Sequence, residues 1–465
     1  MPDYDLVVIG SGPAGERGAT EAAYFGKKVA LVEKAGVLGG ATANTGTLPS
    51  KTLRETALYL SGFRQRGLFG VDLSLKERVT IKELMFRERK VKENERARVA
   101  WNLGQHGVRL VGGTASLADP HTVAVRKADG STEQLSADVI LVATGSSPNR
   151  PPLYAFEDDR IHDSDELLDM HEVPETLAVI GGGVIGCEYA CTFAALGIPV
   201  TLLEQREKII PFLDGEIGGL LRERMEALGV QFAMPDSVKA CDSSGKTIKL
   251  SLQSGKVLEV SAVLVAAGRT GNTAGLNLDT HGIKLDPRGR VLVDATYCTS
   301  VPHIYAAGDV IGFPALASTS MEQGRIAVAH AFGFADEAAL ASILPYGVYT
   351  IPEVSMAGET EESLKEKKID YVVGRAHLSR NPRGEIIGET YGVLKLLFQR
   401  DNMKLLGVHV LGEQASELVH VGLTALLTNE GAGLFLRTCF NYPTLSEGYK
   451  HATFAAIAAK DGKHV

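Results

Sequence analysis

The feature that most constrains the fold of this chain is a glycine-rich pattern that occurs twice. LVVIGSGPAG at residues 6–15 is repeated as LAVIGGGVIG at residues 177–186, an offset of 171 residues. The same offset relates the three glycines of each copy and a glutamate that ends a second apolar run further on. The corresponding residues are Gly10, Gly12, Gly15 and Glu33 in the first copy and Gly181, Gly183, Gly186 and Glu204 in the second.

Each copy has the order of a dinucleotide-binding βαβ unit. An apolar strand leads into the glycines, small residues predict the helix that follows, and a second strand ends at the acid. The first glycine permits a tight turn, the second lets a pyrophosphate approach the backbone, and the third lets helix and strand pack closely. The phosphates lie at the helix N-terminus, where unpaired N–H groups favour anions. We therefore predict an α/β protein with two Rossmann-like dinucleotide-binding domains, in which each acid accepts hydrogen bonds from a ribose.

A second, weaker repeat indicates where the domains begin and end. LVATGSSPN at 141–149 resembles LVAAGRTGN at 264–272, and each is typical of a buried strand that leads into a glycine turn. HIYAAGDV at 303–310 predicts a further strand that ends at Asp309, a carboxylate that either holds sugar or ribityl hydroxyls or serves only in a turn. We predict a first domain of residues 1–149 and 272–340 and a second of residues 150–271. Residues 341–465 contain apolar runs but no glycine fingerprint, and we predict an α+β third domain there.

Composition excludes several classes of function. The chain has 48 basic and 56 acidic residues and a net charge of −8, which argues against a general nucleic-acid or anionic-membrane surface. No apolar run reaches the roughly 18 residues of a membrane span, and the N-terminus has no basic segment typical of an export signal. We expect no nucleic-acid partner, no membrane association and a cytoplasmic location. The five cysteines match no metal-binding spacing, and we expect Cys187 and Cys191 to be buried thiols.

Together these motifs resemble the flavoproteins with two dinucleotide-binding domains, the family of glutathione reductase and lipoamide dehydrogenase, over nearly the whole chain. The resemblance implies that the first domain binds FAD, the second binds a nicotinamide nucleotide, and the third forms a homodimer, with larger homo-oligomers found in one branch. It also implies that Lys51 lies near the flavin N5 and that Glu188 is its ion-pair partner, so these two are the candidate catalytic residues. Further candidates for contacts with FAD or the nucleotide are Thr144, Gly145, Val184, Ile185, Arg269, Asp309 and Ala317.

The chain departs from the disulfide reductases of this family at two places. In GGATANTGTLPSK, residues 39–51, Thr42 and Thr47 stand where those enzymes have a redox-active cysteine pair. In FNYPTLSE, residues 440–447, Tyr442 stands where they have the histidine that serves as acid and base. Thiol exchange needs both a thiolate and a group that manages its proton. The two losses together indicate a substrate that needs no thiol, and the resemblance then points to the branch that exchanges hydride between NADH/NAD and NADPH/NADP.

Several alternatives stay open at the level of sequence. Electrons could pass to a quinone or dye, which would make the protein an NAD(P)H:quinone reductase on the same fold, or the chain could be a nucleotide-sensing or structural subunit. Thr42 and Thr47 either fill space or contact the flavin or a ribose. Tyr442 either approaches the flavin across a dimer or only packs.

The choice of nucleotide depends on LLEQREK at residues 202–208. Glu204 should bond the ribose of NAD(H) and repel the 2′-phosphate of NADP(H), whereas Arg206 could offset that repulsion by turning over the phosphate. We expect NAD(H) to bind better, with use of both nucleotides open, and we expect removal of the Glu204 carboxylate to improve the use of NADP(H).

Overall fold

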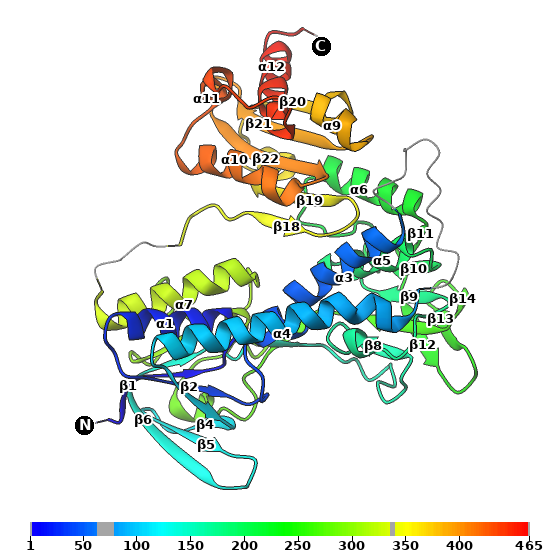
Figure 1. Ribbon diagram of the computed structural model, residues 1–465. Helices are drawn as coiled ribbons and strands as arrows, with labels where there is room; N and C mark the ends of the chain where they lie inside the picture. The colour runs from blue at the N-terminus through cyan, green and yellow to red at the C-terminus, as the bar shows by residue number, and fades with distance from the viewer. Residues whose placement is uncertain (1, 63–78, 335–339, 464–465) are drawn as a thin grey trace.

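The structure is a computed structural model that describes residues 2–62, 79–334 and 340–463. Figure 1 shows two α/β units at the bottom of the view and a third unit of strands and helices above them. The predicted class is confirmed: two dinucleotide-binding α/β units are followed by an α+β unit. The domain boundaries themselves stay a prediction.

The first unit is built on one sheet that combines strands from both ends of its predicted domain. Its parallel part has the order β3-β2-β1-β6-β17. These strands are β1 Tyr4–Ile9, β2 Val29–Glu33, β3 Arg109–Gly112, β6 Thr132–Val142 and β17 Ile304–Ala306, and β4 Thr114–Asp119 and β5 Thr122–Arg126 add an antiparallel extension. Helices α1 Pro13–Tyr24, α4 Ile81–Gln105 and α7 Ala317–Phe332 cover one face of this sheet (Figure 1).

The second unit repeats the βαβ pattern on a separate parallel sheet of order β11-β10-β9-β15-β8. Its apolar strands are buried on both faces, as parallel strands usually are. The elements are β8 Ile161–Asp163, β9 Leu177–Ile180, α5 Val184–Ala195, β10 Val200–Leu203, α6 Gly215–Leu228, β11 Val230–Ala233 and β15 Ala262–Val265, with β12 Val238–Asp242, β13 Ile248–Leu252 and β14 Val257–Val260 as an antiparallel sheet.

The chain crosses between the first two units through a pair of short antiparallel strands. Strand β7, Ser146–Pro148, pairs with β16, Arg269–Gly271. These strands belong to the two segments that resemble each other in sequence, so the outgoing and returning crossings lie side by side. The pairing places Ser146 and Arg269 close to the C-terminal end of β6.

The third unit is an antiparallel sheet of order β18-β19-β22-β21-β20 with helices packed on it. Its elements are β18 Tyr346–Val348, β19 Glu353–Gly358, α8 Glu361–Glu366, β20 Tyr371–His377, α9 Pro382–Ile387, β21 Val393–Gln399, β22 Leu405–Gly412, α10 Ala415–Leu427, α11 Ala432–Arg437 and α12 Gly448–Lys460. The apolar runs of this segment, YGVLKLLFQ, KLLGVHVLG and ELVHVGLTALLTNEG, correspond to β21, β22 and α10.

Two helices near the N-terminus carry the segment with the threonines. Helix α2 spans Gly40–Asn44, and α3 spans Thr47–Leu60. The buried face of α3 shares one hydrophobic core with α5 of the second unit and with Val354 and Met356 of the third. This shared core fixes where the side chains of α3 and α5 lie relative to each other.

Candidate active site

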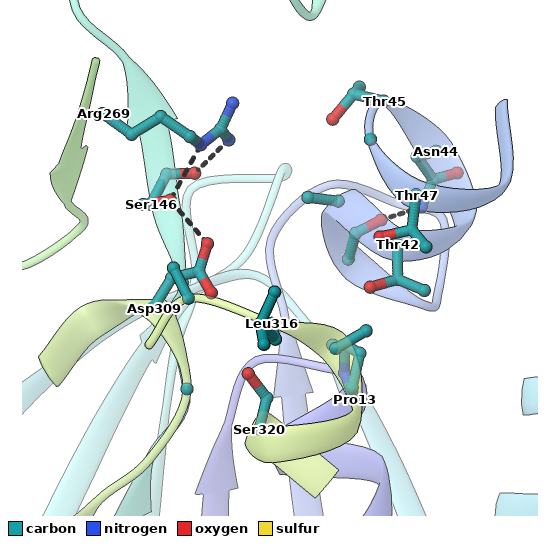
Figure 2. Close-up of a pocket in the computed structure, with 18 of the residues that line it drawn as sticks. Pro13, Thr42, Asn44, Thr45, Thr47, Ser146, Arg269, Asp309, Leu316 and Ser320 are labelled. Carbon is teal, nitrogen blue, oxygen red and sulfur yellow. Dashed lines mark hydrogen bonds between the residues drawn. The ribbon is translucent and has the colours of Figure 1, made fainter. Parts of the chain in front are cut away.

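A cavity of about 1610 Å³ lies where the first unit, the second unit and strand β18 meet. Figure 2 shows Arg269, Ser146 and Asp309 on one side of it and Thr42 and Thr47 on the other. The predicted site residues that line this cavity are Gly10, Gly12, Glu33, Lys51, Thr144, Gly145, Val184, Ile185, Glu188, Arg269, Asp309 and Ala317. The other predicted site residues lie outside its lining: Gly15, Gly181, Gly183, Gly186, Glu204 and Arg206.

The glycines of the two fingerprints have the same geometry. Gly10 has φ +107° and Gly181 has φ +112°, a backbone conformation that favours glycine. A Cβ at Gly15 would lie 1.9 Å from the carbonyl oxygen of Gly10, and a Cβ at Gly186 would lie 1.9 Å from that of Gly181. The absence of a side chain at the third glycine therefore lets each helix pack closely against the turn formed by the first glycine. Because α1 and α5 begin immediately after these turns, each turn presents a helix N-terminus, which is suited to an anion.

Glu33 ends the second strand of the first unit and lies on the cavity wall. Its Oε2 accepts hydrogen bonds from the backbone N of Ser11 at 3.0 Å and from its Oγ at 2.6 Å. Its Oε1 accepts one from the backbone N of Ala35 at 2.9 Å. These bonds hold the carboxylate in place beside the first glycine turn, where it can accept hydrogen bonds from a ribose.

Asp309 belongs to a polar chain that includes the crossing strands. Ser146 Oγ donates to Asp309 Oδ2 at 2.8 Å, and Arg269 Nε donates to Ser146 Oγ at 2.9 Å. Arg269 Nη1 also forms an ion pair with Asp165 at 3.0 Å. Arg269 is thus held by the protein itself at the cavity wall (Figure 2), and its contact with a nucleotide stays a prediction.

Lys51 and Glu188 meet inside the cavity although they lie 137 positions apart in sequence. Lys51 Nζ, on α3, is 2.7 Å from Glu188 Oε2, on α5. Glu188 Oε1 accepts a hydrogen bond from the backbone N of Tyr349 at 2.9 Å, and Lys51 Nζ lies 5.1 Å from the centre of the Tyr349 ring. Because Tyr349 follows β18, all three units contribute to this contact. The arrangement fixes an ammonium group at the cavity wall.

The segment with the threonines lies across the cavity from Ser146, Arg269 and Asp309 (Figure 2), and Thr47 begins helix α3. Thr42 and Thr47 both line the cavity. The cavity lining, as far as the described ranges 2–62, 79–334 and 340–463 show it, contains no cysteine, and all five cysteines are free thiols. Cys187 and Cys191 are buried, as predicted, and burial raises the pKa of Cys191 to about 12. Tyr442 is 66% exposed on the single chain, and its role stays a prediction.

Glu204 directly follows β10, the second strand of the second βαβ unit, and is almost fully buried. Its carboxylate is held by backbone N–H groups and by the guanidinium of Arg206. Burial acts to raise the pKa of Glu204, but the hydrogen bonds from Arg206 and the backbone outweigh it and leave that pKa below its ordinary value. The carboxylate is therefore ionised at neutral pH and already paired.

Two residues that form hydrogen bonds with the predicted site residues were not identified from the sequence. Ser146 lies within the repeated segment LVATGSSPN, but its partner Asp309 and the partner of Tyr349, Glu188, each lie more than 100 positions away in sequence. The position of Ser146 in the turn segment that follows a repeated strand is a signal that could have identified it. Tyr349 acts through its backbone N–H, which leaves no signal in the residue type.

Two family models match the chain. The model described as pyridine nucleotide-disulphide oxidoreductase matches residues 4–324, and the model of the dimerisation domain of the same family matches residues 344–453. Two dinucleotide-binding units that share a cavity with a lysine–glutamate pair define a class of flavin- and nicotinamide-dependent oxidoreductases. The chain belongs to the pyridine nucleotide-disulphide oxidoreductase family. The match to the dimerisation domain supports the predicted homodimer.

Curated relatives are similar over almost their full length. The chain is 44% identical over 453 residues to the soluble pyridine nucleotide transhydrogenase of Mycobacterium bovis, covering 97% of each chain. It is 38% identical over 458 residues to the proteins of the same name from Colwellia psychrerythraea and Yersinia pestis, covering 98% of each chain.

Solved structures confirm the fold. LpdA from Mycobacterium tuberculosis superposes with a TM-score of 0.90 at 28% identity, covering 97% of this chain and 99% of that one. The HOCl-induced flavoprotein disulfide reductase RclA from Escherichia coli superposes with a TM-score of 0.87 at 26% identity, covering 97% of this chain and 99% of that one. Within the described part of the chain, we find no helix with the length and apolar character of a membrane span.

Proposed function

We propose that the protein exchanges hydride between NAD(H) and NADP(H) through bound FAD. The net reaction is NADH + NADP+ → NAD+ + NADPH, in either direction, with the two nucleotides using the cavity in turn. The observation that carries the proposal is the Lys51–Glu188 pair, which lines a cavity that also contains Thr42 and Thr47 in place of thiols. The names of the curated relatives support the same reaction.

The first unit has the residues that FAD needs. The turn at Gly10 and Gly12 and the N-terminus of α1 suit its pyrophosphate, because the absence of side chains leaves backbone N–H groups accessible. Glu33 suits the adenosine ribose and Asp309 the ribityl hydroxyls. The remaining candidates on this side are Thr144, Gly145 and Ala317. When bound, FAD supplies a carrier for two electrons, and the protein positions it.

The second unit would hold the nicotinamide nucleotide. The turn of Gly181, Gly183 and Gly186 at the N-terminus of α5 suits the pyrophosphate. Val184 and Ile185 lie between Gly183 and Gly186 and line the shared cavity with aliphatic side chains, which suit the face of a nicotinamide ring. Glu204 and Arg206 lie at the ribose end of this unit, and Arg269 lies at the cavity wall.

Lys51 would act electrostatically. A fixed ammonium group favours negative charge that develops beside it during reduction, and Glu188 together with the backbone N of Tyr349 keeps that ammonium in place. A hydride carries two electrons, so its transfer between nucleotides requires no thiol and no proton-transfer residue. The threonines and Tyr442 are compatible with this chemistry.

Anaerobic reduction of the purified FAD protein with one equivalent of NADH tests the proposal. The flavin absorbance should bleach, and it should return when NADP+ or thio-NAD+ is added, with NADPH or thio-NADH formed in equal amount. Reoxidation by a quinone but by neither nucleotide would identify the protein as an NAD(P)H:quinone reductase instead.

The location and assembly of the protein are parts of the same proposal. We infer that it acts in the cytoplasm, where both nucleotide pools are present. The family of the third unit supports a homodimer, and a larger homo-oligomer remains a prediction that light scattering of the purified protein tests.

A further inference from the structure

The internal repeat allows the two acidic sites of this chain to be compared atom by atom. The offset of 171 residues pairs Glu33 with Glu204, Ser11 with Gly182, and Ala35 with Arg206. In both copies Oε2 accepts a hydrogen bond from the backbone N of residue 11 or 182, at 3.0 and 2.8 Å. In both copies Oε1 accepts one from the backbone N of residue 35 or 206, at 2.9 Å. The backbone frame around the two carboxylates is therefore the same.

The side chains around that frame differ. In the first copy, Ser11 Oγ donates to Glu33 Oε2, a neutral contact that leaves the negative charge of the carboxylate uncompensated. In the second copy, Gly182 has no side chain to offer, and a Cβ there would lie 3.0–3.1 Å from side-chain atoms of Glu204. Arg206 Nη2 takes the vacant position on Oε2 at 2.8 Å, and Nε bonds Oε1 at 2.9 Å. The second site is thus a closed ion pair with no net charge.

The two members of this pair differ in their freedom to move. The side chain of Glu204 is 3% exposed, whereas that of Arg206 is 50% exposed. If the guanidinium left, both backbone hydrogen bonds would still hold the Glu204 carboxylate. Arg206 can therefore exchange partners while Glu204 stays where it is.

We propose that Arg206 sets the choice between the two pyridine nucleotides by exchanging its guanidinium between Glu204 and the 2′-phosphate of NADP(H). Paired with Glu204, it cancels the charge that would repel the phosphate. Turned to the phosphate, it supplies a charge-assisted contact. With NAD(H), the ribose hydroxyls take the positions on Glu204 that the guanidinium vacates. This inference rests on the proposed function and gives that site a mechanism for accepting both nucleotides.

The decisive variant is Arg206→Ala, which gives the second site the residue of the first. We expect the FAD-loaded variant to bind 2′,5′-ADP roughly 10- to 100-fold more weakly than the wild type, the range for loss of a hydrogen bond to a charged group. Binding of 5′-ADP, which lacks the 2′-phosphate, should weaken far less, so the ratio of the two dissociation constants changes. Isothermal calorimetry measures both. Arg206→Lys, which keeps the charge but loses the fork geometry, should lie between the two proteins.

Arg222→Ala is the matched control, because Arg222 pairs with Glu226 on the surface of α6 in the same unit. It should change neither dissociation constant. An Arg206→Ala protein that loses affinity for both analogues equally would overturn the proposal, since Arg206 would then only support the loop. An unchanged ratio would overturn it too. Failure of the proposed function is separate: in the wild type, either NADH would not bleach the flavin, or neither NADP+ nor thio-NAD+ would restore its absorbance.

Discussion

At the scale of the residue, the contact that matters most is Lys51 with Glu188. Glu188 is almost fully buried and has two partners, the ammonium of Lys51 and the backbone N–H of Tyr349. Each partner comes from a different unit, so a displacement of any unit would loosen the pair. The same contact fixes the charge on the cavity wall and ties together the units that form the cavity.

Replacement of Lys51 by methionine should retain FAD and slow its reduction. The glycine turn, Glu33 and Asp309 are untouched, but the fixed cation is lost, and removal of one preorganised electrostatic group costs about 10²-fold in rate. Stopped-flow absorbance with NADH under anaerobic conditions measures this rate. Lys82→Met, at an exposed position of α4, is the control. Equal rates for the two variants would show that Lys51 has only a structural role.

At the scale of the element, the N-termini of α1 and α5 have the same geometry but are proposed to bind different ligands, FAD and the nicotinamide nucleotide. The third glycine of each fingerprint contacts the first so closely that any side chain must push its helix away. Since α1 belongs to the first unit and α5 to the second, the same substitution can be made in each unit.

Gly15→Ala should give a protein purified without flavin, whereas Gly186→Ala should be yellow but not bleached by NADH. In each variant the new Cβ would lie 1.9 Å from a backbone oxygen, which displaces the helix N-terminus from the phosphates. The visible spectrum before and after addition of NADH distinguishes the two results. Gly104→Ala in α4, where a Cβ meets no atom within 4 Å, should behave as the wild type. Full flavin content in Gly15→Ala would contradict the assignment of the first unit.

At the scale of the whole molecule, a buried lysine connects the second and third units. Lys395 on β21 is fully buried, and its Nζ lies 2.7 Å from Asp214, 2.8 Å from Glu216 and 2.5 Å from Glu361. These three carboxylates could otherwise hold a cation together, but Nζ already neutralises part of their charge. Burial acts to raise the pKa of Asp214 and of Glu361, but nearby positive charge and hydrogen bonds, including those of Lys395, outweigh it and leave both below their ordinary values.

Replacement of Lys395 by methionine should lower the free energy of unfolding by about 3–5 kcal/mol at pH 8, the range for breaking a buried ion pair. In the wild type, carboxylates with lowered pKa contribute stability that is present above their unfolded pKa, near 4, and is lost as the pH falls through the folded value. Without Lys395 the same carboxylates repel each other and take up protons more readily. The difference between the two proteins should therefore shrink as the pH falls towards 5.

Urea unfolding at pH 8 and at pH 5 measures this difference. Lys365→Met removes an exposed lysine that lies 3.8 Å from Glu361 and should cost less than about 1 kcal/mol. A Lys395→Met protein as stable as this control at pH 8 would show that the cluster does not hold the two units together.

Much of the fold could be predicted because it depends on residues close together in sequence. The apolar strand, the glycine turn, the small-residue helix and the terminal acid lie within about 30 residues of each other, as in any dinucleotide-binding βαβ unit. The structure has β1, α1 and β2 and β9, α5 and β10 at these places. The burial of Lys395 was not foreseen, because one lysine within the apolar run YGVLKLLFQ is also compatible with a strand that has one face in water.

The sequence by itself determined two dinucleotide-binding units, the positions of their glycine turns and the acids that end their second strands. It did so because local backbone sterics and the periodicity of a strand depend on residues that are neighbours in sequence. Only the tertiary structure decided that the Glu188 carboxylate accepts hydrogen bonds from both Lys51 and the backbone N of Tyr349. It also decided that Arg206 donates to Glu204, whereas Ser11 donates to Glu33 in the other copy. Such contacts depend on how units pack and which way long side chains turn, and those distances arise only when the whole chain is folded.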